Sequence, residues 1–180
     1  MIRAIVVDDE PSLLEIAKRF LEKQGGFEID TASTAQEAFT LLKGGVYDAV
    51  VSDYRMSDMD GLQFLKTLRD RGNEIPFILF TGHGREEVAM VALNSGADFY
   101  LQKQGDPRTQ FAELKNMMTV SVQRREADVK LRVSEENYRH LLESSPALIC
   151  RLSPTGEIIF VNSIVREYTE YDVDSLKGAN

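Results

Sequence analysis

The chain has 180 residues, of which 43% are hydrophobic and 28% charged, with one cysteine and a net charge of −8. This apolar share supports a packed core, and no apolar run approaches the ~20 residues that cross a bilayer. A single cysteine cannot form an internal disulfide. The acidic balance argues against direct nucleic-acid binding, which normally uses a basic patch. Because the N-terminus also lacks a signal-peptide pattern, we expect a soluble, cytoplasmic protein with no membrane partner.

Short apolar runs alternate with helical patterns from the N-terminus onward. Ile2–Val7 is continuous and rich in β-branched residues, which is typical of a strand buried on both faces. Further strands are predicted at Phe27–Asp30, Tyr47–Val51, Pro76–Phe80 and Ala97–Leu101. Helical patterns begin near Pro11, Thr34, Asp60 and Arg85. This alternation predicts βαβ units, and hence a doubly wound α/β domain around a five-stranded parallel sheet.

The character of the sequence changes after Asp106-Pro107. Residues 108–145 contain no Gly and no Pro and predict a long helix, whose first part carries an apolar stripe able to pack on the sheet. Residues 147–152 and 157–161 flank the turn signal Ser153-Pro154-Thr155-Gly156 and predict a hairpin. Short helices are expected from Ser163 and near Asp174–Lys177. We therefore divide the chain into a domain at 1–120, a helical linker at 121–143 continuous with the domain's last helix, and part of a second domain at 144–180.

Polar side chains stand at the ends of four predicted strands. Asp8 and Asp9 follow the first, Asp53 the third, Thr81 the fourth and Lys103 the fifth. Because the carboxyl ends of parallel strands meet at one edge of a sheet, we expect these groups to converge. Several carboxylates brought together favour a bound cation, and hard oxygen ligands suit Mg²⁺. A carboxylate beside a hydroxyl, an ammonium and Mg²⁺ is equipped to take up and hold a phosphoryl group.

In its first 120 residues the chain resembles the response-regulator receiver domain, the phosphoacceptor module of two-component signalling, with its flavodoxin-like fold. The resemblance rests on the acidic pair Asp8-Asp9, on Asp53 in VVSDYRM, on Thr81 in FILFTG and on Lys103 in DFYLQK. Asp60-Gly61 and Gly96-Ala97-Asp98 match further loops of the family.

The resemblance implies roles for these residues. Asp53 would accept a phosphoryl group from the phosphohistidine of a histidine kinase or phosphotransfer protein. Asp8, Asp9, Asp53 and the main-chain carbonyl of Arg55 would bind Mg²⁺ or Mn²⁺. Lys103 and Thr81 would contact the phosphate. Thr81 and Tyr100 would form the switch that changes the face made by the fourth helix, fifth strand and fifth helix.

Several residues depart from the family pattern or suggest a different reading. Ser57 and Gln104 stand where the family usually has proline, so the Lys103–Gln104 bond is expected to be trans. We interpret His83 as a loop surface residue and Cys150 as a small core residue of an apolar strand. His140 precedes Leu141 rather than an acidic residue, which argues against a kinase phosphoacceptor box.

Residues 144–180 resemble the opening of a PAS sensor domain, which adds a partial α+β segment after the long helix. The resemblance implies a downstream output that the longer parent protein could supply as a histidine kinase. The long helix suggests a homodimer formed through the last receiver helix and the linker, with loose heptads of a coiled coil. We expect no stand-alone enzyme, beyond a domain that catalyses its own phosphorylation and dephosphorylation.

Two alternatives remain open from the sequence. One is a receiver-like interaction or dimerisation module that is never phosphorylated. The other is a metal-dependent phosphatase with an aspartyl nucleophile. A phosphatase would need a second acid two residues after the nucleophile, where this chain has Arg55. The complete strand-end set argues against the interaction module.

Overall fold

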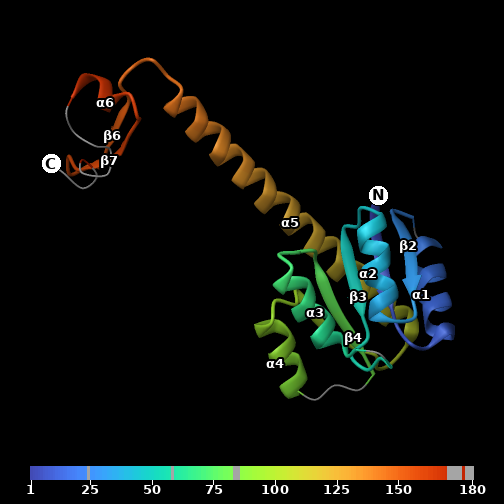
Figure 1. Ribbon diagram of the computed structural model, residues 1–180. Helices are drawn as coiled ribbons and strands as arrows, with labels where there is room; N and C mark the ends of the chain where they lie inside the picture. Colours follow the sequence, from blue (N-terminus) through green and yellow to red (C-terminus); the bar gives the residue numbers. More distant parts are fainter. Residues whose placement is uncertain (24, 58, 83–85, 170–175, 177–180) are drawn as a thin grey trace. The chain divides into compact units, whose positions relative to one another are not determined.

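The computed structural model describes residues 1–23, 25–57, 59–82, 86–169 and 176. The chain divides into two compact units, Met1–Glu126 and Ala127–Asn180. Strands and helices alternate through the first unit, as Figure 1 shows. The elements are β1 (Ile2–Val7), α1 (Pro11–Lys23), β2 (Phe27–Ala32), α2 (Ala35–Gly44), β3 (Ala49–Ser52), α3 (Gly61–Asp70), β4 (Phe77–Thr81), α4 (Glu86–Asn94), β5 (Phe99–Gln102) and α5 (Pro107–Glu143).

The five strands of the first unit form one parallel sheet in the order β2-β1-β3-β4-β5. The chain runs outward from β1 to β2 and then crosses back to β3, so the strand order switches beside β1. Ligands of doubly wound sheets bind at such a switch point, beyond the carboxyl ends of the strands. The predicted fold class, a five-stranded doubly wound α/β domain followed by a long helix, is confirmed.

Two hydrophobic clusters fill the two faces of the sheet. One buries the apolar residues of α1 and the first part of α5 against the sheet, and includes Leu21, Phe80 and Leu114. The other buries residues of α2 and α3, with Phe39 and Phe64 in edge-to-face contact at 4.8 Å between ring centroids. Both faces are therefore covered, which explains why the strands read as continuous apolar runs rather than as alternating patterns.

The five strands of the first unit agree with the predictions to within two residues, whereas the later strand predicted at 147–152 begins only at Cys150. β5 begins at Phe99 rather than at Ala97. Just before it, Asp98 contacts the first residue of β4 partly through its side chain and not through main-chain bonds alone. Its main-chain N–H donates to the carbonyl of Phe77 at 2.8 Å, and its side chain accepts from the N–H of Phe77 at 2.8 Å. Gly96 turns the chain into this contact with φ +92°.

α5 is a single helix of 37 residues, and only its first part is buried. The buried positions recur at helical spacing and include Phe111, Leu114, Met118 and Val122, which pack on the sheet as the sequence predicts. No helix among the described residues is long and apolar enough to cross a membrane.

Beyond α5, the second unit contains a two-stranded antiparallel hairpin, β6 (Cys150–Leu152) and β7 (Ile158–Val161), and the short helix α6 (Val165–Tyr168). The predicted turn is present, with the N–H of Ser153 bonded to the carbonyl of Glu157. The interpretation of Cys150 as a core residue is wrong, because its side chain is exposed. The helix expected near Asp174–Lys177 lies outside the described residues, apart from residue 176.

The buried side chain of Asn162 joins three parts of the second unit. Its Oδ1 accepts from the N–H of Ile149 at 2.9 Å, and its Nδ2 donates to the carbonyls of Leu142 and Ala147. Glu143 adds a bond at 2.7 Å from the N–H of Ser163 to its carboxylate. The end of α5, the loop after it and the hairpin are therefore held together by side-chain bonds.

Candidate functional site

The sheet register brings the polar strand ends to one edge. Val7 pairs with Ser52 across β1 and β3, and Thr81 pairs with Gln102 across β4 and β5. Asp8 and Asp53 each follow one of the first pair, while Lys103 follows the second. The main chain continues this alignment, since the N–H of Asp53 donates to the carbonyl of Val7 and that of Lys103 to Thr81, both at 2.8 Å.

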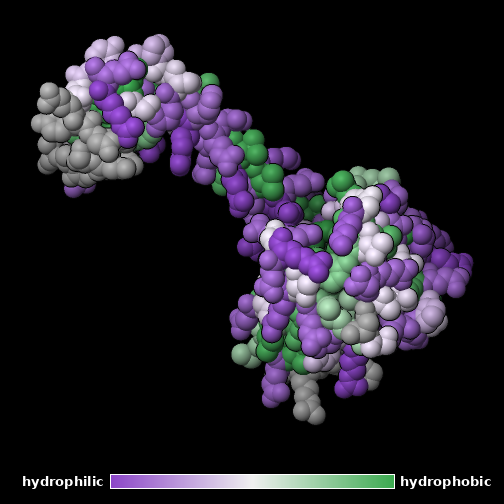
Figure 2. Space-filling model, viewed as in Figure 1, coloured by the Kyte–Doolittle hydropathy of each residue, from purple (hydrophilic) through white to green (hydrophobic). Residues whose placement is uncertain are grey.

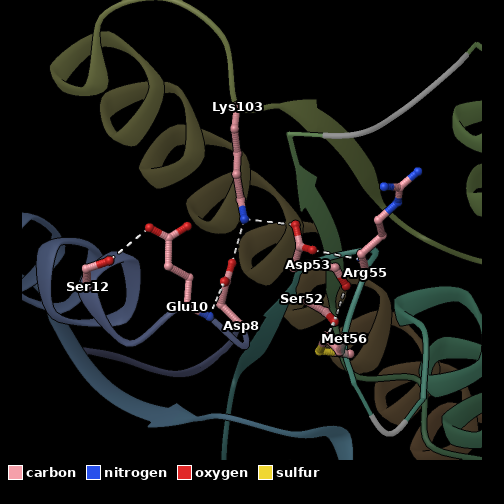
Figure 3. Close-up of polar contacts among 8 residues, drawn as sticks. All are labelled: Asp8, Glu10, Ser12, Ser52, Asp53, Arg55, Met56 and Lys103. Atoms are coloured by element: carbon pink, nitrogen blue, oxygen red, sulfur yellow. Dashed lines mark hydrogen bonds and ion pairs between the residues drawn. The ribbon is translucent and has the colours of Figure 1, made fainter.

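Lys103 contacts two of the predicted carboxylates. Its Nζ donates to Oδ2 of Asp8 at 2.5 Å and to Oδ1 of Asp53 at 2.8 Å. Figure 3 shows the ammonium extending from above toward both side chains, with Asp8 from β1 and Asp53 from β3 converging on it. The side chains of Asp8, Asp53 and Lys103 are thus brought together as the sequence analysis expects.

Main-chain donors fix the other oxygen of each carboxylate. Oδ1 of Asp8 accepts from the N–H of Glu10 at 3.0 Å, and Oδ2 of Asp53 accepts from the N–H of Arg55 at 2.8 Å. Only 3% of Asp8 and 7% of Asp53 are exposed. Both carboxylates are therefore held in place by the backbone as well as by Lys103, with little surface left to solvent.

Burial and pairing act in opposite directions on the ionisation of this cluster. Burial raises the pKa of Asp8, although the hydrogen bond from Lys103 works against it. Burial alone would lower the pKa of Lys103, but the bonds to Asp53 and Asp8 outweigh it and the pKa is raised. Lys103 is consequently charged at neutral pH and is the cation that balances these buried acids.

The remaining predicted residues surround this triad. Thr81 is fully buried at the end of β4, and Tyr100 is half-buried on β5, where its hydroxyl accepts a long bond of 3.4 Å from Gln102. Asp9 is exposed on the loop after β1. No peptide bond of the described residues is cis, so the Lys103–Gln104 bond is trans. His83 lies outside the described residues.

The carboxylates at this edge of the sheet fit a hard divalent cation, although the ammonium of Lys103 already contacts two of them. Asp8 and Asp53 present one carboxylate oxygen each to the ammonium of Lys103, and exposed Asp9 adds a third carboxylate nearby in sequence, which matches the chemistry of Mg²⁺ ligands. Within the described ranges, no three His, Cys, Asp or Glu side chains already form a metal cluster. The ammonium lies between the two buried carboxylates where such a cluster would form.

Two residues support the main chain of Asp53 in ways that the sequence did not predict, although Gly61 was already matched to a loop of the family. The hydroxyl of Ser52, buried at the end of β3, donates to the carbonyl of Asp53 at 2.9 Å. Gly61 lies so close to the same carbonyl that a Cβ there would overlap it and the side chain of Leu79. A polar residue at the end of an otherwise apolar strand, and a glycine at the start of a helix, are the signals that could have identified them.

The family model described as "Response regulator receiver domain" matches residues 4–115. The response regulator Rre1 of Synechocystis is 34% identical over 119 residues, which cover 65% of this chain and 52% of Rre1. The chain spans about half the length of the curated relatives that it matches.

Solved structures agree with the sequence comparison. A receiver domain protein of Clostridium thermocellum superposes with a TM-score of 0.63 at 26% identity, covering 71% of this chain and 98% of that one. The response regulator TrrA of Thermotoga maritima, determined in complex with Mg²⁺-BeF, gives a TM-score of 0.56 at 31% identity, covering 65% and 99%. With its matched sequence, sheet order and strand-end residues, this chain belongs to the response-regulator receiver family of two-component systems.

Proposed function

We propose that this chain is a phosphoacceptor whose Asp53 receives a phosphoryl group from the phosphohistidine of a histidine kinase or phosphotransfer protein. The observation that carries the proposal is the setting of the Asp53 carboxylate. One oxygen accepts from the fixed N–H of Arg55, and the other accepts from the ammonium of Lys103. The carboxylate is thus oriented at the ligand-binding edge of the sheet, beside a positive charge able to stabilise an incoming phosphoryl group.

The transfer step uses Asp53 as nucleophile. A carboxylate oxygen of Asp53 attacks phosphorus, the bond from phosphorus to the donor imidazole nitrogen breaks, and the electron pair returns to that nitrogen. The product is an acyl phosphate. Lys103 is positioned to follow the new negative charge because its flexible stem already delivers the ammonium to Asp53. Thr81, at the neighbouring strand end, would donate a hydrogen bond to a phosphate oxygen.

Asp8, Asp9, Asp53 and the main-chain carbonyl of Arg55 would hold Mg²⁺, or Mn²⁺ in its place. When bound, such an ion supplies positive charge that offsets the repulsion between the carboxylates and the incoming phosphoryl oxygens. The N–H of Arg55 already binds Asp53, so the adjoining main chain is anchored to the acceptor. The family's Mg²⁺ dependence and the Mg²⁺-BeF complex of TrrA support this assignment.

The same proposal includes a switch that is read on α4 and β5. Thr81 would move toward the phosphate and Tyr100 would turn inward. Tyr100 and Val88 both pack against the second core cluster, which links β5 to α4. α4 also exposes Met90, Val91 and Leu93, and Figure 2 shows hydrophobic atoms over this helix. An apolar surface beside the switch is suited to a partner that distinguishes its two states.

Downstream of the receiver, we propose a signalling path through α5 into the opening segment of a PAS domain at residues 144–180. The hairpin of β6 and β7 and the short α6 are compatible with such an opening. Hydrogen bonds of Asn162 and Glu143 join this segment to the end of α5, so a movement of the helix end would be passed to the segment. We also propose that the chain forms a homodimer through α5, and that its output does not involve direct binding of nucleic acid.

Phosphorylation by acetyl phosphate tests the central proposal. With Mg²⁺ present, intact-mass measurement should show one phosphoryl group that hydroxylamine removes, because an acyl phosphate is labile to it. Asp53→Asn should abolish incorporation, whereas Asp70→Asn, an exposed acid at the end of α3, should not. No incorporation into the parent chain, even from a panel of histidine kinases, would reject the phosphoacceptor and favour a phosphorylation-independent interaction module.

A further inference from the structure

The face of α5 that packs on the sheet is buried only as far as Val122. Its buried residues recur every three or four positions through the first unit. Continued at helical spacing, this face is mixed, with Val129 and Val133 among the charged residues Arg125, Asp128, Arg132 and Glu136, and none of these six side chains is buried. The packing that stabilises the start of α5 therefore cannot account for the apolar residues in its later part.

A different face of α5 is apolar and exposed in the second unit. Its positions alternate in steps of four and three residues, the spacing of the a and d sites of a heptad. We call the set the α5 seam, and it consists of Ala127, Leu131, Ser134, Tyr138 and Leu141. Leu131 is 60% exposed and Leu141 69%, and Figure 2 shows hydrophobic atoms gathered along the exposed part of α5.

The same spacing extends the α5 seam toward the N-terminus of the helix. Steps of three and four residues lead back from Ala127 through Arg124 to Val120, which is 43% exposed, whereas Met117, one step further, packs against the core on the sheet. The exposed heptad pattern therefore covers 120–141, which is about three heptads. A stripe of this length, with small and apolar residues at most sites, is suited to another helix with the same pattern.

We infer that the α5 seam is the contact surface of a parallel, in-register two-stranded coiled coil between two copies of this chain. This inference rests on the proposed homodimer and specifies which face of α5 forms it. The partner is a second copy because a heptad seam is self-complementary when two identical helices lie parallel, each a or d residue facing its own counterpart.

Charge around the α5 seam favours the parallel arrangement. Lys130 and Glu135 flank the seam at g and e sites, so in a parallel pair each Lys130 lies opposite Glu135 of the other copy. The other g-to-e pairs, Gln123 with Asp128 among them, bring no like charges together. Arg124 is the one charged residue at an a site of the extended seam. In a parallel pair it faces its own counterpart, which lowers the stability of the dimer, while a single polar residue at an a site fixes the register and the number of strands.

A competing apolar stripe on α5 does not continue. Val122, Val129 and Val133 lie on the face that packs on the sheet at the start of the helix, and the next positions at helical spacing are Glu136, His140 and Glu143. Val122 is also buried against the sheet. Val129, 50% exposed on the opposite side of the helix from the α5 seam, is therefore a matched control for Leu131.

Paired substitutions test the face. Leu131→Asp should raise the dimer dissociation constant of the full chain by about two orders of magnitude, because two buried leucines are replaced by facing charges. Val129→Asp should change it by less than about threefold, since an exposed side chain away from a contact contributes little. Sedimentation equilibrium measures both constants. Equal effects of the two substitutions would overturn the assigned face.

Cysteine cross-linking tests orientation in a Cys150→Ser background, which removes the exposed native thiol. Ala127→Cys and Leu141→Cys lie about 21 Å apart along the helix. In a parallel, in-register pair both variants should form disulfide-linked dimers under mild oxidation, whereas in an antiparallel pair at most one can. Glu136→Cys, on the face of α5 opposite the seam, should remain largely monomeric on a non-reducing gel.

These measurements distinguish failure of the α5 seam from failure of the proposed homodimer. A chain that sediments as a monomer at all concentrations overturns both the homodimer and the α5 seam. A dimer that cross-links through Glu136→Cys, or through only one seam cysteine, overturns the seam or its parallel register and leaves the homodimer standing. Neither result bears on phosphorylation, which the Asp53→Asn comparison decides independently.

Discussion

Replacing Lys103 by methionine isolates the electrostatic balance of the site. The substitution keeps much of the side-chain length but removes the ammonium that lies 2.5 Å from Asp8 and 2.8 Å from Asp53. At an effective dielectric constant of about 20, each contact represents roughly 6 kcal/mol of gross attraction. Much of that attraction offsets the desolvation of the three buried charges. The net effect of removing one partner of a buried ion pair is about 3–5 kcal/mol of destabilisation.

We expect Lys103→Met to lower the free energy of unfolding by about 3 kcal/mol at pH 7 in the absence of divalent cations. Asp8 and Asp53 would then face each other without a counter-charge. Urea unfolding followed by circular dichroism measures the change. Lys66→Met, at an exposed position of α3, is the matched control and should stay within about 0.5 kcal/mol of the parent chain.

Mg²⁺ should partly restore the Lys103→Met variant. A ligand that binds only the folded state adds RT ln(1 + [L]/Kd) to stability, which is about 2.7 kcal/mol at a hundredfold excess over Kd. Because the variant lacks the competing ammonium, it should bind Mg²⁺ more tightly and gain more stability from it than the parent chain. A variant that unfolds at the same urea concentration as the parent, and gains no more from Mg²⁺, would refute this account of the site.

Three further predictions concern other parts of the chain. Gly61→Ala should destabilise by about 1–3 kcal/mol and slow phosphorylation, since its Cβ would overlap the acceptor's carbonyl, whereas Gly44→Ala, with open space around it, should not lower the melting temperature. Tyr47→Phe removes a hydrogen bond that, first among several causes, lowers the pKa of Asp30. A lowered carboxyl pKa stabilises above the ordinary value of 3.8 and loses that effect as pH falls through the folded pKa. The variant should therefore be less stable than the parent by about 1 kcal/mol near pH 7, with the difference vanishing in acid denaturation curves below that range. Asn162→Ala should increase hydrogen exchange at amides of the β6–β7 hairpin by about tenfold or more without altering exchange in the sheet of the first unit, and equal protection in both chains would contradict its joining role.

The strand ends could be predicted because buried parallel strands leave a clear mark in sequence. Each is an apolar run on both faces, so the first polar residue after it, such as Asp53 or Lys103, stands at the sheet edge. The long helix was equally clear, since residues 108–145 contain neither Gly nor Pro. These features depend on local sequence and on the rule that parallel strands share one direction, and no knowledge of side-chain contacts is needed.

Contacts between distant segments could not be predicted in this way. The bond from Lys103 to Asp8 joins residues 95 positions apart. Local sequence patterns show neither that the two side chains are bonded nor that the ammonium competes with a cation for Asp8. Gly61 shows its importance only when the main chain of Asp53 lies against it. Cys150 reads as buried because its neighbours are apolar, yet burial depends on what packs over the strand, and its side chain is exposed.

The site combines a rigid acceptor with a movable counter-charge. Backbone donors from Arg55 and Glu10 hold Asp53 and Asp8, and Ser52 ties the main chain behind the acceptor. Lys103 reaches them through four methylene groups, so its ammonium can follow a change in charge without movement of the strands. Under the proposed function, the contact that balances the resting site is the one that would receive the phosphoryl charge. Arginine at this position would therefore not substitute for lysine, because its planar group cannot occupy the same compact point between two fixed carboxylates.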